Sequence, residues 1–134
     1  MFVDASAIVA LMSGEREAER VASALNGAKQ AITSPVAMLE AVLALARADK
    51  FDSPVGQVEP LVMAFLNERG IELCDLPPAA DLARYSAAAA AAYRRGRHGL
   101  NICDCLHYAC AKHYGVPILA TDDEFRRTDL ETID

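Results

Sequence analysis

Four acidic side chains lie where apolar segments end or turn. Carboxylates with this spacing could bind a metal ion together. They are Asp4, Glu40, Asp104 and Asp122. Carboxylates that share one pocket repel one another, so they are costly unless a cation lies between them. Ligand sets made only of oxygen suit Mg²⁺ or Mn²⁺ rather than zinc. We therefore predict that these four acids form one shared metal site.

Asp104 and Asp4 also have a simpler interpretation, as helix caps. Asn101 is a good N-cap, which places Asp104 at the third helical position, near the free N–H groups and the positive end of the helix dipole. Asp4 follows the apolar residues 1–3 and precedes a helical pattern, so it could cap that helix. At the end of a parallel strand, however, such a turn is also where ligand-binding groups lie. The sequence leaves both interpretations open.

Glu40 and Asp122 have simpler interpretations as well. Glu40 borders an apolar stripe of its helix, where it could reach water or pair with Arg47. Asp122 begins a run of three acids that repel one another, and the run could be an exposed loop that pairs with the arginines at 126–127. Only the combination of all four acids favours a metal site over these separate explanations.

Strand and helix patterns alternate along the chain, and this alternation predicts how the acids are positioned. We expect a helix from residue 35 to about residue 50, opened by a serine and a proline. Alternation of this kind implies a parallel sheet with right-handed crossovers. Asp4 and Asp122 would then emerge at one edge of the sheet. Glu40 and Asp104 would lie on helices whose N-terminal parts face that edge. The expected strands are residues 1–3, 31–33, 71–74 and 117–120.

Length, composition and charge limit the classes of protein. The 134 residues, 53% of them apolar, suit one domain with a real core. A formal charge of −6 argues against broad coating of nucleic acid, although a carboxylate site would itself add negative charge. We see no apolar stretch long enough to span a membrane and no secretory signal. Four cysteines in such a composition indicate free thiols in a reducing cytoplasm.

One concentrated basic patch precedes the Asp104 helix. It contains Arg94, Arg95 and Arg97. Arginines at a helix end favour the dipole and could simply be solvated there. The functional interpretation is a rim that contacts phosphates of a polyanionic substrate beside the acidic pocket.

Cys103, His107 and Cys110 share one face of the Asp104 helix. A structural zinc site would need a fourth ligand, which the sequence does not offer. No activating base is evident for a cysteine nucleophile. We interpret the three as core residues, small thiols with a hydrogen-bonded histidine.

Taken together, these segments resemble a PIN domain, and more narrowly a VapC-type toxin ribonuclease. The segment 100–109 is the most specific match, and the resemblance spans essentially the whole chain in the family's order. The other matching segments are 3–7, Ser34 and Pro35 followed by Glu40, and 117–119 running into 122–125 and 128–130.

The resemblance implies a three-layer α/β/α sandwich with a central, mostly parallel sheet, formed by residues 1–134 as a single PIN domain. It also implies hydrolysis of RNA phosphodiester bonds that depends on Mg²⁺ or Mn²⁺. The four acids would hold one or two cations, which activate water and offset charge on the phosphate. Family members differ in the position of the fourth acid, so Asp123 is the alternative to Asp122. The hydroxyls of Ser6 and Thr121 would orient the ligands.

The same resemblance implies partners. We expect an RNA substrate, a cognate VapB-like antitoxin and a homodimer. An arginine or lysine of the antitoxin would enter the acidic pocket and replace the charge of the metal.

Two rival functions remain from the sequence. An aspartate-based phosphoryl-transfer enzyme would use Asp4 as its nucleophile, but such enzymes usually place a second acid two residues later, where this chain has Ser6. A non-catalytic dimerisation module could use the acids to bind structural cations.

Overall fold

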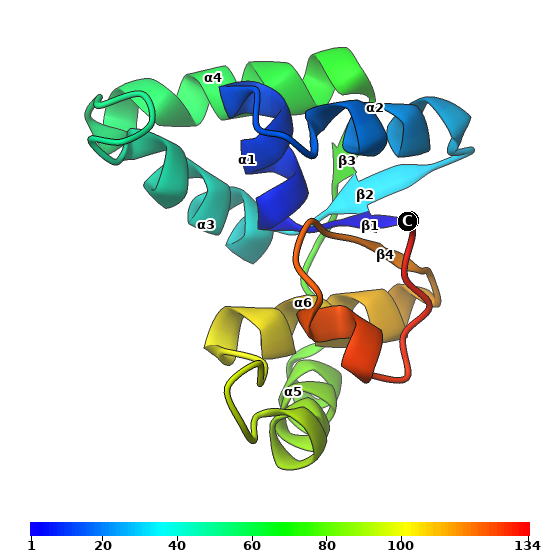
Figure 1. Cartoon of the computed structure of the whole chain (residues 1–134). Coiled ribbons are helices and arrows are strands. Elements are labelled where there is room, and N and C mark those ends of the chain that lie inside the picture. The colour runs from blue at the N-terminus through cyan, green and yellow to red at the C-terminus, as the bar shows by residue number, and fades with distance from the viewer.

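A computed structural model describes all 134 residues, and its centre is a parallel sheet of four strands (Figure 1). The strand order is β3-β2-β1-β4, and each neighbouring pair is parallel. The register places Phe2 opposite both Ile32 and Ile118. The predicted parallel sheet is therefore confirmed. The strands are β1 (Phe2–Val3), β2 (Ala31–Thr33), β3 (Ile71–Leu73) and β4 (Ile118–Leu119).

Helices lie on both sides of this sheet, which gives the predicted three layers (Figure 1). Helices α1 to α4 pack together on one side, and α5 and α6 pack against each other on the other side. None of the helices is both long enough and apolar enough to cross a membrane. The helices are α1 (Ala5–Ser13), α2 (Ala18–Gly27), α3 (Pro35–Ala46), α4 (Val55–Arg69), α5 (Ala79–Tyr93), α6 (Ile102–Tyr114) and the short 3₁₀ helix η1 (Glu124–Arg127).

The strands are short, but their alternation separates two apolar clusters. Val3 and Leu119 belong to the cluster beneath α1 to α4. Their neighbours Phe2 and Ile118 belong to the cluster beneath α5 and α6. Successive side chains of a strand point to opposite faces, so β1 and β4 each contribute to both clusters. The buried sheet fixes the direction in which every strand ends, and hence the edge at which Asp4 emerges.

Side chains at the helix starts hold the helices that bear acids. The Ser34 hydroxyl accepts a hydrogen bond from the N–H of Ala37 at 3.1 Å, and Pro35 occupies the first helical position of α3. In α6 the Asn101 side chain accepts from the N–H of Asp104 at 2.8 Å. These caps account for helices that begin where the sequence predicts.

Helix α3 ends earlier than we expected. It stops at Ala46 rather than near Lys50, and the N–H groups of Lys50 and Asp52 donate back to the Arg47 carbonyl. Asp52 adopts a positive φ of 46°, so the chain turns sharply before α4. The turn brings Lys50 to the cleft beside Arg47.

Candidate active site

Asp4 lies directly after β1 and is buried, with 4% of its surface exposed. Its Oδ2 atom accepts hydrogen bonds from the Ser6 hydroxyl at 2.6 Å and from the Ser6 N–H at 3.0 Å. Its Oδ1 atom is also buried but has no hydrogen-bond partner. Asp4 therefore caps α1 with one oxygen and leaves the other free for a ligand.

Glu40 and His107 meet Asp4 from two different helices. The His107 Nε2 atom lies 3.3 Å from Glu40 Oε1 and 3.6 Å from Asp4 Oδ1. One potential ligand atom from each of these three residues lies within 4.8 Å of the other two. The hydrogen bond from His107 lowers the pKa of Glu40 despite its partial burial. The structure thus brings together two predicted acids and one histidine.

Asp104 is both a cap and a member of the acidic cluster. Its Oδ2 atom accepts the Asn101 N–H at 3.0 Å, which completes a reciprocal capping box. Burial nevertheless raises the pKa of Asp104 to about 6, and the negative charges of Asp4 and Glu40 raise it further against the effect of that hydrogen bond. The two interpretations that the sequence left open are compatible.

Asp122, rather than Asp123, faces the other acids. Asp122 lines a cleft together with Glu40, and burial and the charge of Asp4 raise its pKa. The carboxylate of Asp123 is mostly exposed and lies 3.3 Å from Arg126. The geometry therefore favours Asp122 as the fourth acid.

Glu124 is an acid that our sequence analysis did not include in the site. Burial raises its pKa, and the charges of Asp122 and Asp4 add to the rise. It begins the short helix η1, so its position depends on the turn after β4. The only sequence signal was its place in the run of three acids.

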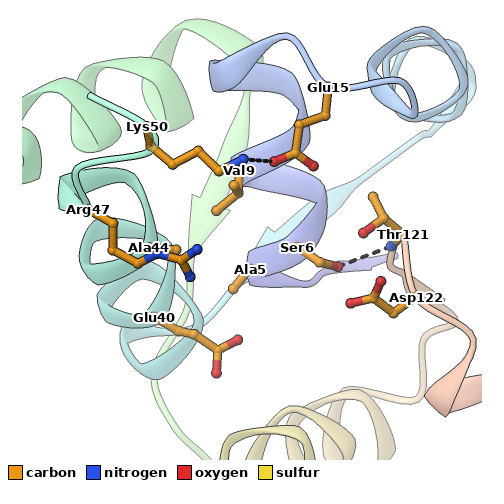
Figure 2. Close-up of a pocket in the computed structure, with 10 residues that line it drawn as sticks. All are labelled: Ala5, Ser6, Val9, Glu15, Glu40, Ala44, Arg47, Lys50, Thr121 and Asp122. Atoms are coloured by element: carbon orange, nitrogen blue, oxygen red, sulfur yellow. Dashed lines mark hydrogen bonds and ion pairs between the residues drawn. The ribbon is translucent and has the colours of Figure 1, made fainter. Parts of the chain in front are cut away.

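Ser6 and Thr121 connect the ends of β1 and β4. Ser6 orients Asp4 as predicted, and its hydroxyl oxygen accepts the Thr121 N–H at 3.0 Å (Figure 2). We expected Thr121 to act through its hydroxyl, but its contact is made by the backbone. Any residue other than proline could supply that N–H, so this contact does not require the threonine side chain.

A cleft of about 300 Å³ opens beside the acids, and two basic residues also line it. Figure 2 shows Arg47 and Lys50 across the cleft from Asp122, with Glu40 on the same helix as Arg47. Lys50 pairs with Glu15 at 2.6 Å. Our sequence analysis considered Arg47 only as a partner of Glu40, whereas its ion pair is with Asp49 at 2.9 Å. The cleft therefore offers both negative and positive groups.

The predicted basic rim lies apart from this cleft. Arg94, Arg95 and Arg97 are exposed in the connection between α5 and α6, and none of them lines the cleft. The connection leads into the N-terminus of α6, the helix that carries Asp104 (Figure 1). An RNA-binding role for these arginines remains a prediction.

His107 is a buried, hydrogen-bonded histidine as we expected, but its partner is the Glu40 carboxylate of the site. It is fully buried, but its Nδ1 atom has no partner and its Nε2 atom faces carboxylates. Cys103 is partly exposed, and burial raises the pKa of its thiol to about 11, with the Glu40 carboxylate adding to the rise. A thiol in this environment stays neutral, which agrees with our exclusion of a cysteine nucleophile.

The donor set fits a divalent cation. An unpartnered buried carboxylate oxygen is costly by itself, and a cation bound to it would remove that cost. The charges of Glu40, Asp104 and Asp122 lie near enough to interact with Asp4 or with one another. Oxygen ligands of this kind bind Mg²⁺, Mn²⁺ or Ca²⁺.

Comparison with known proteins agrees with this fold. The family model "PIN domain" matches residues 1–131. The chain therefore belongs to the PIN domain family.

Within that family, the similarity is to VapC ribonucleases. The chain is 34% identical to ribonuclease VapC30 of Mycobacterium tuberculosis over 99% of this chain and 98% of the relative. It is 35% identical to ribonuclease VapC36 of the same species, over 98% of this chain and 91% of the relative. The chain thus belongs to the VapC ribonucleases, and the predicted ribonuclease toxin is confirmed at the level of this family.

Solved structures show the same fold. The crystal structure of the toxin VapC20 of Mycobacterium tuberculosis, described as cleaving the sarcin-ricin loop, superposes with a TM-score of 0.73 at 17% identity. That match covers 96% of this chain and 95% of the other. A toxin–antitoxin complex from Klebsiella pneumoniae matches with a TM-score of 0.69 at 19% identity, over 96% and 92% of the two chains. At these identities the comparison supports the α/β/α architecture.

Proposed function

We propose that residues 1–134 form a single catalytic domain that hydrolyses RNA phosphodiester bonds with the help of Mg²⁺ or Mn²⁺ and acts as the toxin of a toxin–antitoxin pair. The observation that carries this proposal is the buried Asp4 carboxylate, whose free Oδ1 atom lies beside Glu40 at the carboxyl edge of the sheet. Relatives named VapC ribonuclease support the substrate class.

Asp4, Glu40, Asp104 and Asp122 would hold the cation, directly or through water. A bound divalent cation supplies a more acidic water and offsets charge on the phosphate and on the leaving oxygen. Ser6 keeps the Asp4 carboxylate in one orientation through two hydrogen bonds. Asp123 is the lesser candidate because it pairs with Arg126 outside the cleft.

The cleft itself suits a segment of RNA backbone. Arg47 and Lys50 line it opposite Asp122, so they could contact phosphates near the bond that is cut. Arg94, Arg95 and Arg97 would extend this positive surface next to α6. Local positive charge lets an acidic protein hold a polyanion at one place.

The proposal is tested by incubating the purified chain with total RNA, with Mg²⁺ or Mn²⁺ and with chelator. We expect cleavage that needs the cation and falls at least about 100-fold in Asp4→Asn, the size of loss that removal of a key electrostatic group produces. Asp75→Asn, an exposed aspartate in the loop after β3, is the matched control and should cleave normally. Cleavage by Asp4→Asn at the rate of the control would refute the proposal.

We also propose partners for the chain. An apolar groove of about 260 Å³ between α3 and α4 exposes large side chains that include Leu39, Val55 and Leu73. An antitoxin segment covering this groove would hide apolar surface and could place a basic side chain in the acidic cleft. The structural match to a toxin–antitoxin complex supports an antitoxin as the class of partner.

We further propose a homodimer in the cytoplasm. All four cysteines are free, as is usual for proteins of a reducing compartment. Light scattering of the chain at high micromolar concentration tests the dimer. A mass of one chain, 14.4 kDa, at every concentration would contradict it.

A further inference from the structure

His107 lies at the centre of the acidic cluster. Neither the resemblance of the chain to the PIN family nor the residues around His107 assigned it a role there. It is on α6, three residues after Asp104, so both side chains lie on the same face of that helix. The His107 side chain has no exposed surface, and its ring packs against Phe2 with 5.9 Å between the ring centroids. Packing therefore fixes the direction in which the ring points.

The two ring nitrogens of His107 have different surroundings, which decides where the proton lies. Nε2 faces Glu40 Oε1 at 3.3 Å and Asp4 Oδ1 at 3.6 Å. Nδ1 is buried and has no hydrogen-bond acceptor within reach. A lone pair on Nε2 would repel two carboxylates, whereas an N–H there can donate to one of them. Nε2 therefore carries a proton whether the ring is neutral or charged, and Glu40 accepts it.

This proton position argues against His107 as a metal ligand. Coordination through Nε2 would move the proton to Nδ1, where it would be buried without an acceptor. The three-residue group of Asp4, Glu40 and His107 has distances suitable for a cation, but only the two carboxylates are free to bind one. The imidazole instead acts on the cation through Glu40.

We propose that His107 is a positioning residue that donates a hydrogen bond from Nε2 to Glu40 and thereby holds this carboxylate beside Asp4, ready for the cation. The inference rests on the metal site of the proposed function. Without the donor, the partly exposed Glu40 side chain would rotate among several conformers, and ordering it would weaken cation binding. Hydrogen bonds that orient ligands in this way change metal affinity by about 10- to 100-fold.

Two substitutions separate this role from simple packing. His107→Leu fills similar space but removes the donor, and His107→Gln keeps an amide N–H that can reach Glu40. Cys110→Ala perturbs the same buried side of α6 without touching the acids and serves as the packing control. The fold of each variant is checked by circular dichroism in chelator.

The first measurement is binding of Mn²⁺, followed by the loss of the electron paramagnetic resonance signal of the free ion. We expect His107→Leu to bind Mn²⁺ about 10- to 100-fold more weakly than wild type. His107→Gln and Cys110→Ala should stay close to wild type. In cleavage assays, His107→Leu should need correspondingly more Mn²⁺ but approach the wild-type rate when Mn²⁺ is saturating.

The second measurement is electron spin-echo modulation of bound Mn²⁺, which detects a nitrogen atom bonded directly to the ion. We expect no such nitrogen coupling in wild type. A directly bonded nitrogen that disappears in His107→Gln would overturn the positioning role in favour of ligation. Equal Mn²⁺ affinity of wild type and His107→Leu would overturn the inference and leave the proposed function standing. Absence of Mn²⁺ binding by wild type would overturn both.

Discussion

Replacing Asp104 with asparagine should stabilise the metal-free protein. The substitution keeps the shape of the side chain, and the amide oxygen can still accept the Asn101 N–H that now lies 3.0 Å from Oδ2. What it removes is a negative charge that is partly buried among other negative charges. The perturbation thus separates the capping role of Asp104 from its place in the acidic cluster.

The size of the effect follows from the pKa of Asp104, which burial raises from 3.8 to about 6. Each pKa unit corresponds to about 1.4 kcal/mol. The ionised carboxylate therefore costs the folded state at most about 3 kcal/mol above pH 6, and solvent screening of this partly exposed group reduces the figure. We expect a gain of about 1–2 kcal/mol for Asp104→Asn, which raises the Tm of a domain of this size by about 5 °C.

The raised pKa of Asp104 also determines how the free energy of unfolding changes with pH. Between about pH 4 and pH 6 the native state binds more protons at Asp104 than the unfolded state, so its contribution to the free energy of unfolding falls as pH rises through this window. Asp104→Asn lacks this contribution. The stability difference between the two proteins should be small near pH 4 and reach its full size by pH 7.

Thermal melting of both proteins in chelator at these two pH values measures the effect. Adding Mn²⁺ to about 100 times its Kd should stabilise wild type by about 2.7 kcal/mol, and should stabilise Asp104→Asn less because one ligand charge is gone. The advantage of the variant should therefore shrink or reverse. If Asp104→Asn melts well below wild type in chelator at pH 7, the charge of Asp104 stabilises the start of α6 and its place in the metal site is wrong.

Three other substitutions test the fold and the cleft. Gly99→Ala would press a Cβ atom against the Arg94 carbonyl oxygen, so the turn must shift. We expect the free energy of unfolding in urea to fall by about 1–3 kcal/mol, and an unchanged midpoint would contradict this geometry. Leu66→Ala empties a buried site in the cluster beneath α1 to α4 and should lower the free energy of unfolding by about 2–5 kcal/mol in the same assay. Arg47→Gln should weaken RNA binding and reduce by about one the slope of the log binding constant against log salt concentration. Arg84→Gln, on the exposed face of α5, should change neither. Equal slopes for the two variants would remove Arg47 from the RNA-binding surface.

The sheet and the positions of the acids along it could be predicted because they follow from local patterns. Apolar runs that end in an acid predict strands whose carboxyl ends carry ligands, and this places Asp4 and Asp122 at the same edge. The N-cap residue Asn101 fixes the start of α6 and so the position of Asp104 in its first turn. The family resemblance then supplied the functional meaning of these positions.

The residues that the sequence did not reveal depend on contacts between distant segments. His107 was assigned to the correct helix face, but only the packing of α6 against β1 shows that this face meets Asp4 and Glu40. Lys50 reaches the cleft because α3 ends at Ala46 and the chain turns back. Periodicity places residues on a face of their own element and does not say which side chains of another element that face will meet.

The central claim is that the Asp4 cluster binds the cation that the reaction needs. The most direct test is a crystal soaked in Mn²⁺, with the ion located by its anomalous scattering. We predict a peak within about 2.5 Å of Asp4 Oδ1 and of a Glu40 carboxylate oxygen, the range of metal–oxygen bonds. A strong peak elsewhere on the protein together with none beside Asp4, at a Mn²⁺ concentration that supports RNA cleavage, would contradict the claim.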